Sequence, residues 1–235
     1  MSKIQPHGYK YLDALITAFV VILLVSNLVA QKICRIGPLE VSGAVILFPI
    51  TYIFGDVFTE VYGYGASRRA IWLGFFGTAL LYAMATITIS LPAASGWHNQ
   101  AAFETVFGFI PRILFASIIA YFLGEFANSY TLARMKLVTN GKMLWTRTVG
   151  STIVGQAVDT AVVMTLTFGF TIPWTDIGRL IVTGYLLKVV YEVLATPVTY
   201  AVVGWLKRSE GVDAFDRHTS FNPFHFAGGE LGDRD

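Results

Sequence analysis

Apolar residues in this 235-residue chain gather into six long blocks that are separated by short polar segments. Each block approaches the roughly 20 residues that a helix needs to cross a bilayer. A buried core helix of a soluble protein can mimic one such block, but not six. The blocks are Leu12–Ala30, Val41–Phe58, Ile71–Leu91, Ile113–Phe126 with an earlier start near Phe107, Val149–Phe170 and Leu180–Leu206.

This pattern predicts an all-α, polytopic membrane protein with six transmembrane helices. Lipid offers the backbone no hydrogen-bond partners, so each spanning segment must satisfy its own amides as a helix. We expect a membrane domain over residues 12–206, a short N-terminal segment over 1–11 and a polar tail over 207–235. The first block has the length of a span and lacks a small-residue cleavage site, so we do not expect a cleavable signal peptide.

The composition agrees with a membrane protein. Hydrophobic residues make up 54% of the chain, charged residues only 14%, and the mean hydropathy is +0.60, whereas soluble domains carry roughly a quarter charged residues. A net charge of +2 gives no reason to expect a nucleic-acid partner. Cys34 is the single cysteine and the four histidines lack metal-ligand spacing, so no disulfide, metal site or cofactor is expected.

The positive charges predict the orientation in the membrane. If the N-terminus is cytoplasmic, twelve Lys and Arg residues fall on the inner side and four on the outer side. Cytoplasmic loops retain such residues. Both termini are therefore expected on the cytoplasmic side of the membrane.

The stretch GQAVDT places a carboxylate, Asp159, inside the fifth block. A charge at the centre of a bilayer costs roughly 2.5–3.5 kcal/mol even on the lower scales, so an unpartnered one is seldom tolerated. Gln156 lies three residues earlier and shares its helical face. Gly155 permits another backbone or a ligand to approach closely. These residues are candidates for a substrate site.

Other blocks carry polar residues as well. Because lipid cannot be their destination, the simplest geometry is one shared interior cavity. They are Asn27 in the first block, Asp56 and Glu60 beyond Pro49 in the second, Glu125 and Asn128 in the fourth, and Lys188 and Glu192 in the sixth. Two alternatives stay open. Lys188 and Glu192 could form a structural ion pair, and Asn27 could join two helices by hydrogen bonding.

An internal spacing hints at two halves. Gly55-Asp56 precedes Gly155-Gln156 by 100 positions, and Asn27 precedes Asn128 by 101. Two three-helix repeats would explain both offsets. Because three is odd, such repeats would be inverted in the membrane, as in many transporters that bind substrate near the midplane.

Four stretches resemble the bacterial queuosine precursor transporters, which are also grouped as vitamin uptake transporters. They are SNLVAQK at 26–32, FPITYIFGDVFTEVYGYGASRR at 48–69, GQAVDT at 155–160 and FDRHTSFNPF at 215–224. The resemblance implies a six-helix importer of deazaguanine bases such as preQ0, preQ1 or queuine. These bases are precursors of a modified tRNA nucleoside.

A guanine-like base suggests roles for the candidate residues. Its two adjacent N–H donors suit a carboxylate, and its carbonyl suits an amide or ammonium donor. We therefore expect Asp159 or Glu192 to accept from the base and Gln156 or Lys188 to donate to it. Asn27 and Asn128 complete the expected substrate site.

We assign the second block and the loop after it to the conformational change and ion coupling of transport. We expect Asp56 and Glu60 to serve in gating or to carry a coupled proton, since a buried carboxylate can bind and release protons near neutral pH. Arg68 and Arg69 in the following loop could pair alternately with these acids as the inner side closes.

Two other classes of function compete with a transporter. A substrate-binding subunit of an ATP-driven vitamin importer would also have six helices, and Ala14 and Ala18 form a small-residue patch that could contact a partner helix. An intramembrane enzyme is not expected, because the chain has no GxSxG or HExxH motif and no histidine within a block. The sequence leaves open whether the chain forms a homodimer.

Overall fold

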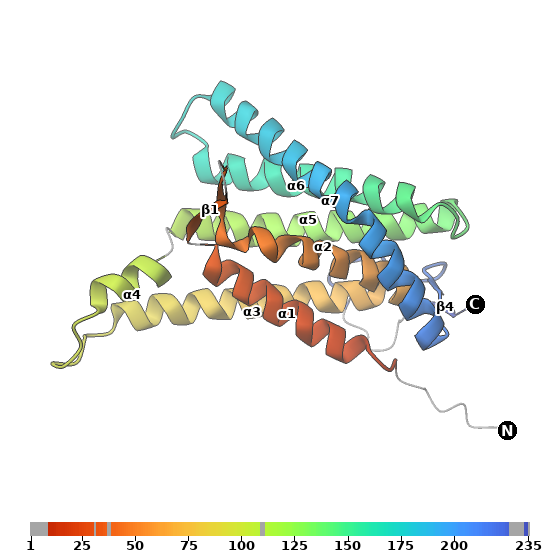
Figure 1. The fold of residues 1–235 in the computed structure, drawn as a ribbon, viewed down its shortest axis with the longest axis horizontal. Helices are drawn as coiled ribbons and strands as arrows, with labels where there is room; N and C mark the ends of the chain where they lie inside the picture. The colour runs from red at the N-terminus through yellow and green to blue at the C-terminus, as the bar shows by residue number, and fades with distance from the viewer. Residues whose placement is uncertain (1–8, 31, 37–38, 109–110, 226–232, 235) are drawn as a thin grey trace.

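The computed structural model describes residues 9–30, 32–36, 39–108, 111–225 and 233–234. The chain is mostly helical and its long helices form one bundle (Figure 1). The helices are α1 (Leu12–Val29), α2 (Phe48–Val57), α3 (Tyr64–Ser90), α4 (Gln100–Phe107), α5 (Pro111–Val138), α6 (Leu144–Phe168) and α7 (Trp174–Glu210). A 3₁₀ turn, η1 (Gly43–Ile46), precedes α2, and a π-helical turn, η2 (Phe58–Tyr62), follows it.

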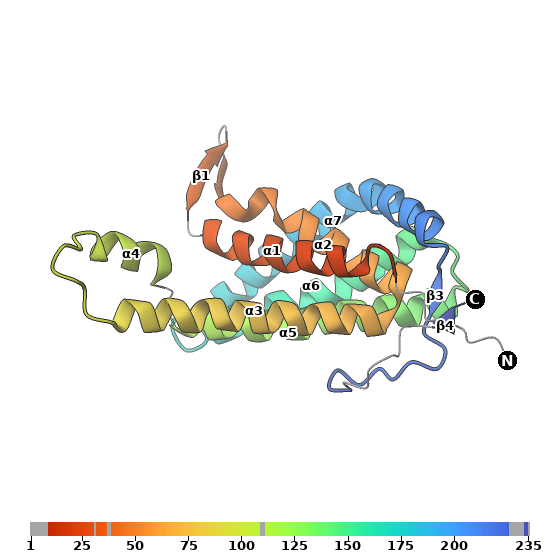
Figure 2. The same ribbon diagram turned by 90° about the horizontal axis from the view of Figure 1, so that it is seen from below.

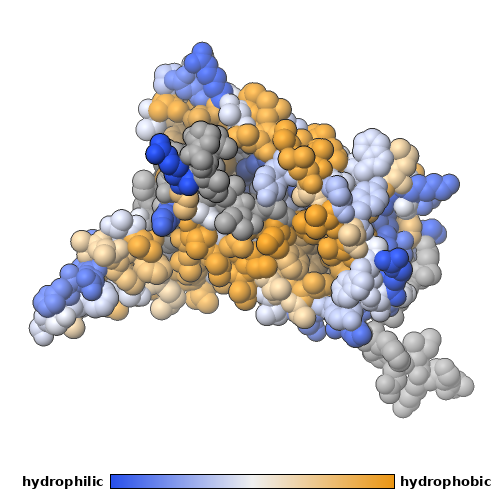
Figure 3. Space-filling model, viewed as in Figure 1, coloured by the Kyte–Doolittle hydropathy of each residue, from blue (hydrophilic) through white to orange (hydrophobic). Residues whose placement is uncertain are grey.

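The surface of the bundle is apolar, as lipid contact requires. Among the described residues, five helices are long and apolar enough to cross a membrane: α1, α3, α5 from Ile113, α6 and α7. Large apolar side chains such as Phe76, Leu80 and Phe115 point outward. The face seen in Figure 3 has a broad apolar band, and polar residues gather beyond it. The chain is thus a polytopic helical membrane protein.

The second predicted block is not one helix from Val41. Its first residues form strand β2 (Leu39–Ser42), which pairs antiparallel with β1 (Ile33–Ile36), and η1 follows. Helix α2 begins only at Phe48, with Pro49 in its first turn. Proline lacks an amide hydrogen and suits that position, so Pro49 starts the helix and does not interrupt it. The expectation of a purely α-helical chain needs this small correction.

Helices α2 and η2 together form one helical stretch from Phe48 to Tyr62. At about 1.5 Å per residue this stretch is roughly 22 Å long, shorter than the ~30 Å hydrocarbon core. This explains why its length alone does not mark it as a span. The stretch ends at Gly63, whose φ of 87° favours glycine and lets the chain turn sharply into α3.

The other boundaries differ from the predicted ones mainly at the ends. Helix α3 starts seven residues before Ile71, and α7 runs beyond both ends of its predicted block to reach 37 residues. Phe107 ends the separate helix α4 and does not begin the fourth span. Polar residues at helix ends lie outside the hydrocarbon, so hydropathy alone underestimates helix length. Most of the segment 1–11 and much of the end of the tail lie outside the described residues.

Successive helices run in opposite directions along the bundle (Figures 1 and 2). Helices α1, α3 and α6 lead away from the end that holds both termini, and α2, α5 and α7 return to it. The β1–β2 hairpin and α4 lie at the opposite end. Pro197 lies inside α7, where it removes one helix hydrogen bond and favours a bend. The helix changes direction in its second half (Figure 1).

Helices α5 and α6 make the most extensive contact in the bundle. Glycines allow their backbones to approach closely. A Cβ added to Gly155 would lie 2.7 Å from Asn128 Cβ and 3.0 Å from the Gly124 carbonyl oxygen, and one on Gly124 would lie 2.7 Å from Asp159 Cβ. The close approach that Gly155 was predicted to permit is made by α5, and it places Asn128 and Asp159 at the crossing.

The bundle is filled at the end that holds the termini. A core there joins α1, α2, η2 and the end of α7 through buried residues such as Phe19, Phe58 and Leu206. The C-terminal segment after α7 covers this end. The Asp216 carboxylate accepts from the Tyr64 amide at 3.0 Å and so caps the start of α3.

Candidate functional site

One large cavity opens inside the bundle, with a volume of about 420 Å³. Ligand pockets typically measure about 300–1,000 Å³. Six helices line it: α1, α2, α3, α5, α6 and α7. The lining residues lie near the middles of α3, α5 and α6, from the middle of α1 toward its end, and in the first half of α7. The cavity therefore lies in the middle of the bundle and extends toward the end that is remote from the termini.

The structure brings six of the predicted site residues to this one cavity, from five helices: Asn27, Asp56, Asn128, Gln156, Asp159 and Lys188. Residues of α1, α2, α5, α6 and α7 are far apart in the sequence, and the tertiary fold places them together. Four predicted residues do not line the cavity: Glu60, Arg68, Arg69 and Glu192.

An ion pair crosses from α6 to α7 on the wall of the cavity. Lys188 Nζ donates to the Asp159 carboxylate, and both side chains are only partly buried. The intrahelical pair between Lys188 and Glu192, one alternative from the sequence, does not form here. Lys188 reaches across to the neighbouring helix instead, because Asp159 faces it at the α6–α7 contact.

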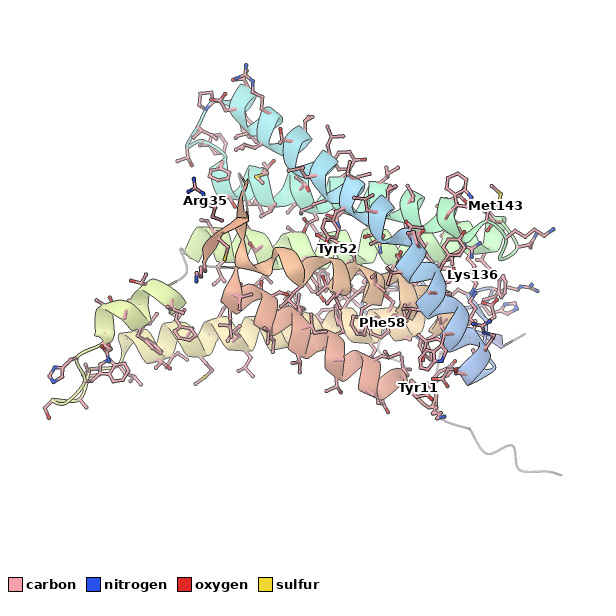
Figure 4. The ribbon with its side chains drawn as sticks, viewed as in Figure 1. Tyr11, Arg35, Tyr52, Phe58, Lys136 and Met143 are labelled. Carbon is pink, nitrogen blue, oxygen red and sulfur yellow. The ribbon has the colours of Figure 1, made fainter. Side chains whose placement is uncertain are left out.

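Polar groups without hydrogen-bond partners surround this pair. Among the described residues, the Gln156 side-chain oxygen and the Asn128 side-chain oxygen are buried and accept no hydrogen bond. Tyr52 lies beside Gln156 and Asp159 in the middle of the bundle (Figure 4). An aromatic ring, an amide and an ion pair thus face one space. Such a set can hold a flat polar ligand by hydrogen bonds and ring contact.

Two carboxylates lie deeper, between α2 and α7. Asp56 and Glu192 are neighbours, each with a side chain about 1% exposed. The Asn128 amide lies beside Asp56, but no described residue donates a hydrogen bond of normal geometry to any of the four carboxylate oxygens. Asp56 lines the cavity and Glu192 lies behind it. Glu125 on α5 lies near both.

Glu60 belongs to a separate charge network at the end of the bundle that holds the termini. Its side chain is fully buried and accepts from Arg147 Nη2 and Lys207 Nζ, each at 2.7 Å. Lys136 Nζ donates to the Glu60 backbone carbonyl at 2.6 Å and to Asp213 at 2.5 Å. The network joins η2, α5, α6, α7 and the segment after α7. Figure 4 shows Lys136 near this end.

Asp213 completes this network outside the membrane helices. Lys207 Nζ lies 2.7 Å from its carboxylate, which Lys136 also contacts. Burial raises the pKa of Asp213, but hydrogen bonds from Lys136 and Lys207 outweigh that effect and hold the pKa below its ordinary value. Asp213 therefore stays ionised and offsets part of the excess positive charge around Glu60.

Arg68 and Arg69 contact neither Asp56 nor Glu60 in this structure. Arg68 donates to the backbone carbonyls of Ser220 at 2.9 Å and Asn222 at 3.1 Å. Arg69 pairs with Asp13 at 3.1 Å on the exposed surface. The reason is positional: the first turn of α3 faces the C-terminal segment and the start of α1.

Sequence reasoning missed several residues of these two sites. Lys136, Arg147 and Lys207 looked like loop charges that follow the positive-inside rule, and only the fold shows that Glu60 binds all three. Tyr52 was not singled out, because aromatic residues are frequent in membrane helices. The available signal for a second acidic site was Glu60, which lies four residues beyond Asp56 on the same helical stretch.

Comparisons with known proteins agree with this architecture. A sequence model of the family described as “Putative vitamin uptake transporter” matches residues 42–202. The chain is 27% identical over 187 residues to a protein of Bacillus subtilis (strain 168) named “Probable queuosine precursor transporter”, covering 79% of this chain and 81% of that protein. It is 24% identical over 156 residues to the “Queuosine precursor transporter” of Escherichia coli (strain K12), covering 66% and 68%.

No solved structure matches the chain. The family match spans well over half of the chain, and the cavity and the apolar surface are those of a multi-pass transporter of the bacterial inner membrane. The chain belongs to the vitamin uptake transporter family, and it is similar to two queuosine precursor transporters.

Proposed function

We propose that this protein imports a queuosine precursor, a deazaguanine base, through the cavity between its helices. The names of the two relatives support this substrate class. The observation that carries the proposal is the convergence of polar side chains from five helices on one cavity inside an otherwise apolar bundle. A scaffold without a ligand would gain nothing from charges at this depth.

The geometry suits the edge of such a base. A carboxylate beside an ammonium offers an acceptor and a donor side by side, and the base presents N–H donors next to a carbonyl. In our proposal the base binds at the ion pair of Asp159 and Lys188. The Gln156 side-chain oxygen, which is buried and accepts no hydrogen bond in the structure, accepts one from the base. Tyr52 covers the face of the ring, and Asn27 and Asn128 border the site.

We further propose that the structure represents a state that is open away from the cytoplasm. Six crossings, with α2 and η2 as the second, place both termini on one side, and the excess of Lys and Arg assigns that side to the cytoplasm. The cavity then extends from the middle of the bundle toward the outer side, and the Glu60 network closes the inner end. Two inverted three-helix halves fit this arrangement, with substrate between them.

Uptake by Asp159→Asn tests the proposal directly. The variant removes the charged acceptor and leaves Lys188 unpaired. An unsatisfied buried group costs about 1–3 kcal/mol, so uptake of tritiated 7-cyano-7-deazaguanine at limiting concentration should fall roughly 5- to 100-fold. Arg179→Gln is the matched control, since Arg179 lies on α7 in an exposed pair with Asp176. Undiminished uptake by Asp159→Asn at normal expression would contradict the assignment.

The comparisons favour a transporter over a binding subunit of an ATP-driven importer, because the matched family and both relatives are described as transporters. The purified chain in proteoliposomes distinguishes the two classes. We expect it to exchange the base across the membrane without ATP or partner subunits, which a binding subunit alone would fail to do.

A further inference from the structure

The carboxylates of Asp56 and Glu192 form a buried acidic pair that the substrate site does not use. They belong to α2 and α7, and each side chain is about 1% exposed. Their oxygens receive no hydrogen bond of normal geometry from any described residue, and the neutral Asn128 amide is the donor that lies beside Asp56. Two carboxylates that are neighbours in a dry interior cannot both be ionised, because desolvation and mutual repulsion act in the same direction.

The cations that could neutralise the pair are engaged elsewhere within the described chain. Lys188 binds Asp159, and Arg147 binds Glu60. Lys136 and Lys207 are bound to Glu60 and Asp213. The groups facing Asp56 are Asn128 and Glu125 on α5, Glu60 on η2 and Glu192 itself, so the surroundings add acids and one neutral amide. The environment lacks a protein partner of positive charge.

From this geometry we propose that Asp56 and Glu192 together bind one exchangeable proton, which travels with the substrate and drives its import. The proposal rests on the transport function proposed above and names the site of the coupled ion. It revises the assignments made from the sequence: Glu192 leaves the substrate site to join Asp56, and Glu60 serves to close the inner end.

The position of the pair explains how a proton would be coupled to transport. Asp56 lines the cavity, so a proton from the outer side reaches it through the same space as the substrate. Glu192 lies four residues after Lys188 on α7, and Asp56 lies four residues before Glu60 on the α2–η2 stretch. The pair thus sits one helical turn from the substrate ion pair and one turn from the inner network.

The shared proton lets the two helices stay packed when the outer side closes. Closure around a bound base removes water, and without the proton two negative charges would be enclosed together at a cost of several kcal/mol. The loaded pocket therefore closes only when protonated. On the inner side water returns, the base leaves and one carboxyl group loses its proton as H⁺. The empty cavity keeps its water, which solvates both carboxylates, so the unloaded protein returns without carrying a proton back.

The test uses the full-length protein in proteoliposomes with tritiated 7-cyano-7-deazaguanine. Wild-type protein should accumulate the base above equilibrium when the outside is acidic, and a trapped pH dye should report proton entry that depends on the base. Asp56→Asn and Glu192→Gln mimic the neutral forms and remove buried charge, which favours folding. They should lose gradient-driven accumulation and proton entry, yet keep exchange of labelled for unlabelled base.

Matched controls use acids of similar type outside the pair. Asp176→Asn on α7 and Glu104→Gln on α4 are exposed and should accumulate the base as the wild type does. Glu192→Asp retains a titratable group and should recover part of the accumulation that Glu192→Gln loses. A purely structural role would give no such recovery, and it would impair exchange as much as accumulation.

The outcomes separate this proposal from the proposed function. If wild-type protein exchanges the base but a proton gradient never drives accumulation, or if a sodium gradient drives it instead, the proton site is wrong and the transport function stands. The proton site is equally wrong if Asp56→Asn with Glu192→Gln still accumulates the base. If the wild type neither binds nor exchanges any deazaguanine base, the proposed function itself fails.

Discussion

At the scale of residues, the charged side chains inside the membrane differ in how they are neutralised. Asp159 and Lys188 neutralise each other on the cavity wall, with side chains 24% and 32% exposed. Such a pair adds little stability by itself, because desolvation offsets much of the attraction, but the loss of one partner leaves the other uncompensated. The pair is therefore better suited to binding a ligand than to holding the fold.

Because an unpaired charge costs more than a missing pair, we expect the effects of single substitutions at the ion pair on thermal stability not to add. Asp159→Asn and Lys188→Met should each lower the melting temperature in detergent, and the double variant should lie closer to the wild type than either single variant. The physical reason is that the double variant leaves no unpaired charge. Thermal unfolding followed by intrinsic fluorescence measures all four proteins. Additive losses would mean that the two side chains do not interact.

At the scale of elements, the contact between α5 and α6 positions the substrate site. Gly124 and Gly155 let the two backbones approach, and the residues that flank this crossing include Asn128, Gln156 and Asp159. Small residues are how membrane helices achieve close packing, since lipid provides no hydrophobic drive between helices. A wider crossing would move amide and carboxylate groups away from their common space.

Gly155→Ala tests the importance of this crossing. Its new Cβ would lie 2.7 Å from Asn128 Cβ and 3.0 Å from the Gly124 carbonyl, so α5 must shift. Overpacking of this kind costs about 1–3 kcal/mol, and we expect lower thermal stability together with weaker binding of the base. Gly178→Ala on α7 is the control, because nothing lies within 4 Å of its added Cβ. Equal behaviour of the two variants would contradict the packing argument.

At the scale of the whole molecule, the bundle is closed at one end and contains the cavity toward the other. The end near the termini contains the apolar core around Phe58 and Leu206 and the network around Glu60. The cavity begins near the middle of the bundle, where Phe19 lines it, and extends toward the other end. A transporter that alternates between two openings must be able to undo its closed half, and ionic contacts among five elements break more readily when water enters than an apolar core does.

Glu60→Gln should therefore loosen the inner end. It removes the anion shared by Arg147, Lys136 and Lys207, and breaking a buried pair costs about 3–5 kcal/mol. In a Cys34→Ser background, Ser129→Cys reports access to the inner half, because Ser129 is fully buried there. We expect cysteine labelling from the cytoplasmic side to rise roughly tenfold or more, since each 1.4 kcal/mol corresponds to a factor of ten.

Two controls accompany that measurement. Asp13→Asn removes an anion from the exposed pair with Arg69, where about 0–1 kcal/mol is at stake, and should leave labelling unchanged. Ser117→Cys on the cavity wall should remain accessible from the outer side. Unaltered labelling of Ser129→Cys in the Glu60→Gln protein would show that the network does not close the inner end.

The sequence alone determined the class of the protein and the identity of most polar residues in the cavity. In lipid, a hydrophobic block of spanning length must satisfy its own backbone hydrogen bonds, which it does as a helix. The helical membrane fold therefore followed from the hydrophobic pattern. The depth of Asp159 and Lys188 in apolar blocks marked them, because charge in hydrocarbon is costly wherever the rest of the chain lies. The family motifs in the second and fifth blocks pointed to the family that the comparisons confirmed.

Only the tertiary structure decided which charges are partners. Helical spacing suggested Lys188 with Glu192, but the α6–α7 contact pairs Lys188 with Asp159 and leaves Glu192 beside Asp56. Glu60 and Asp56 looked equivalent one turn apart. Yet three cations from α5, α6 and α7 surround Glu60, and no cation of the described residues pairs with Asp56. Spacing along a helix describes neighbours within that helix, whereas the partners of a buried charge come from whichever helices pack against it.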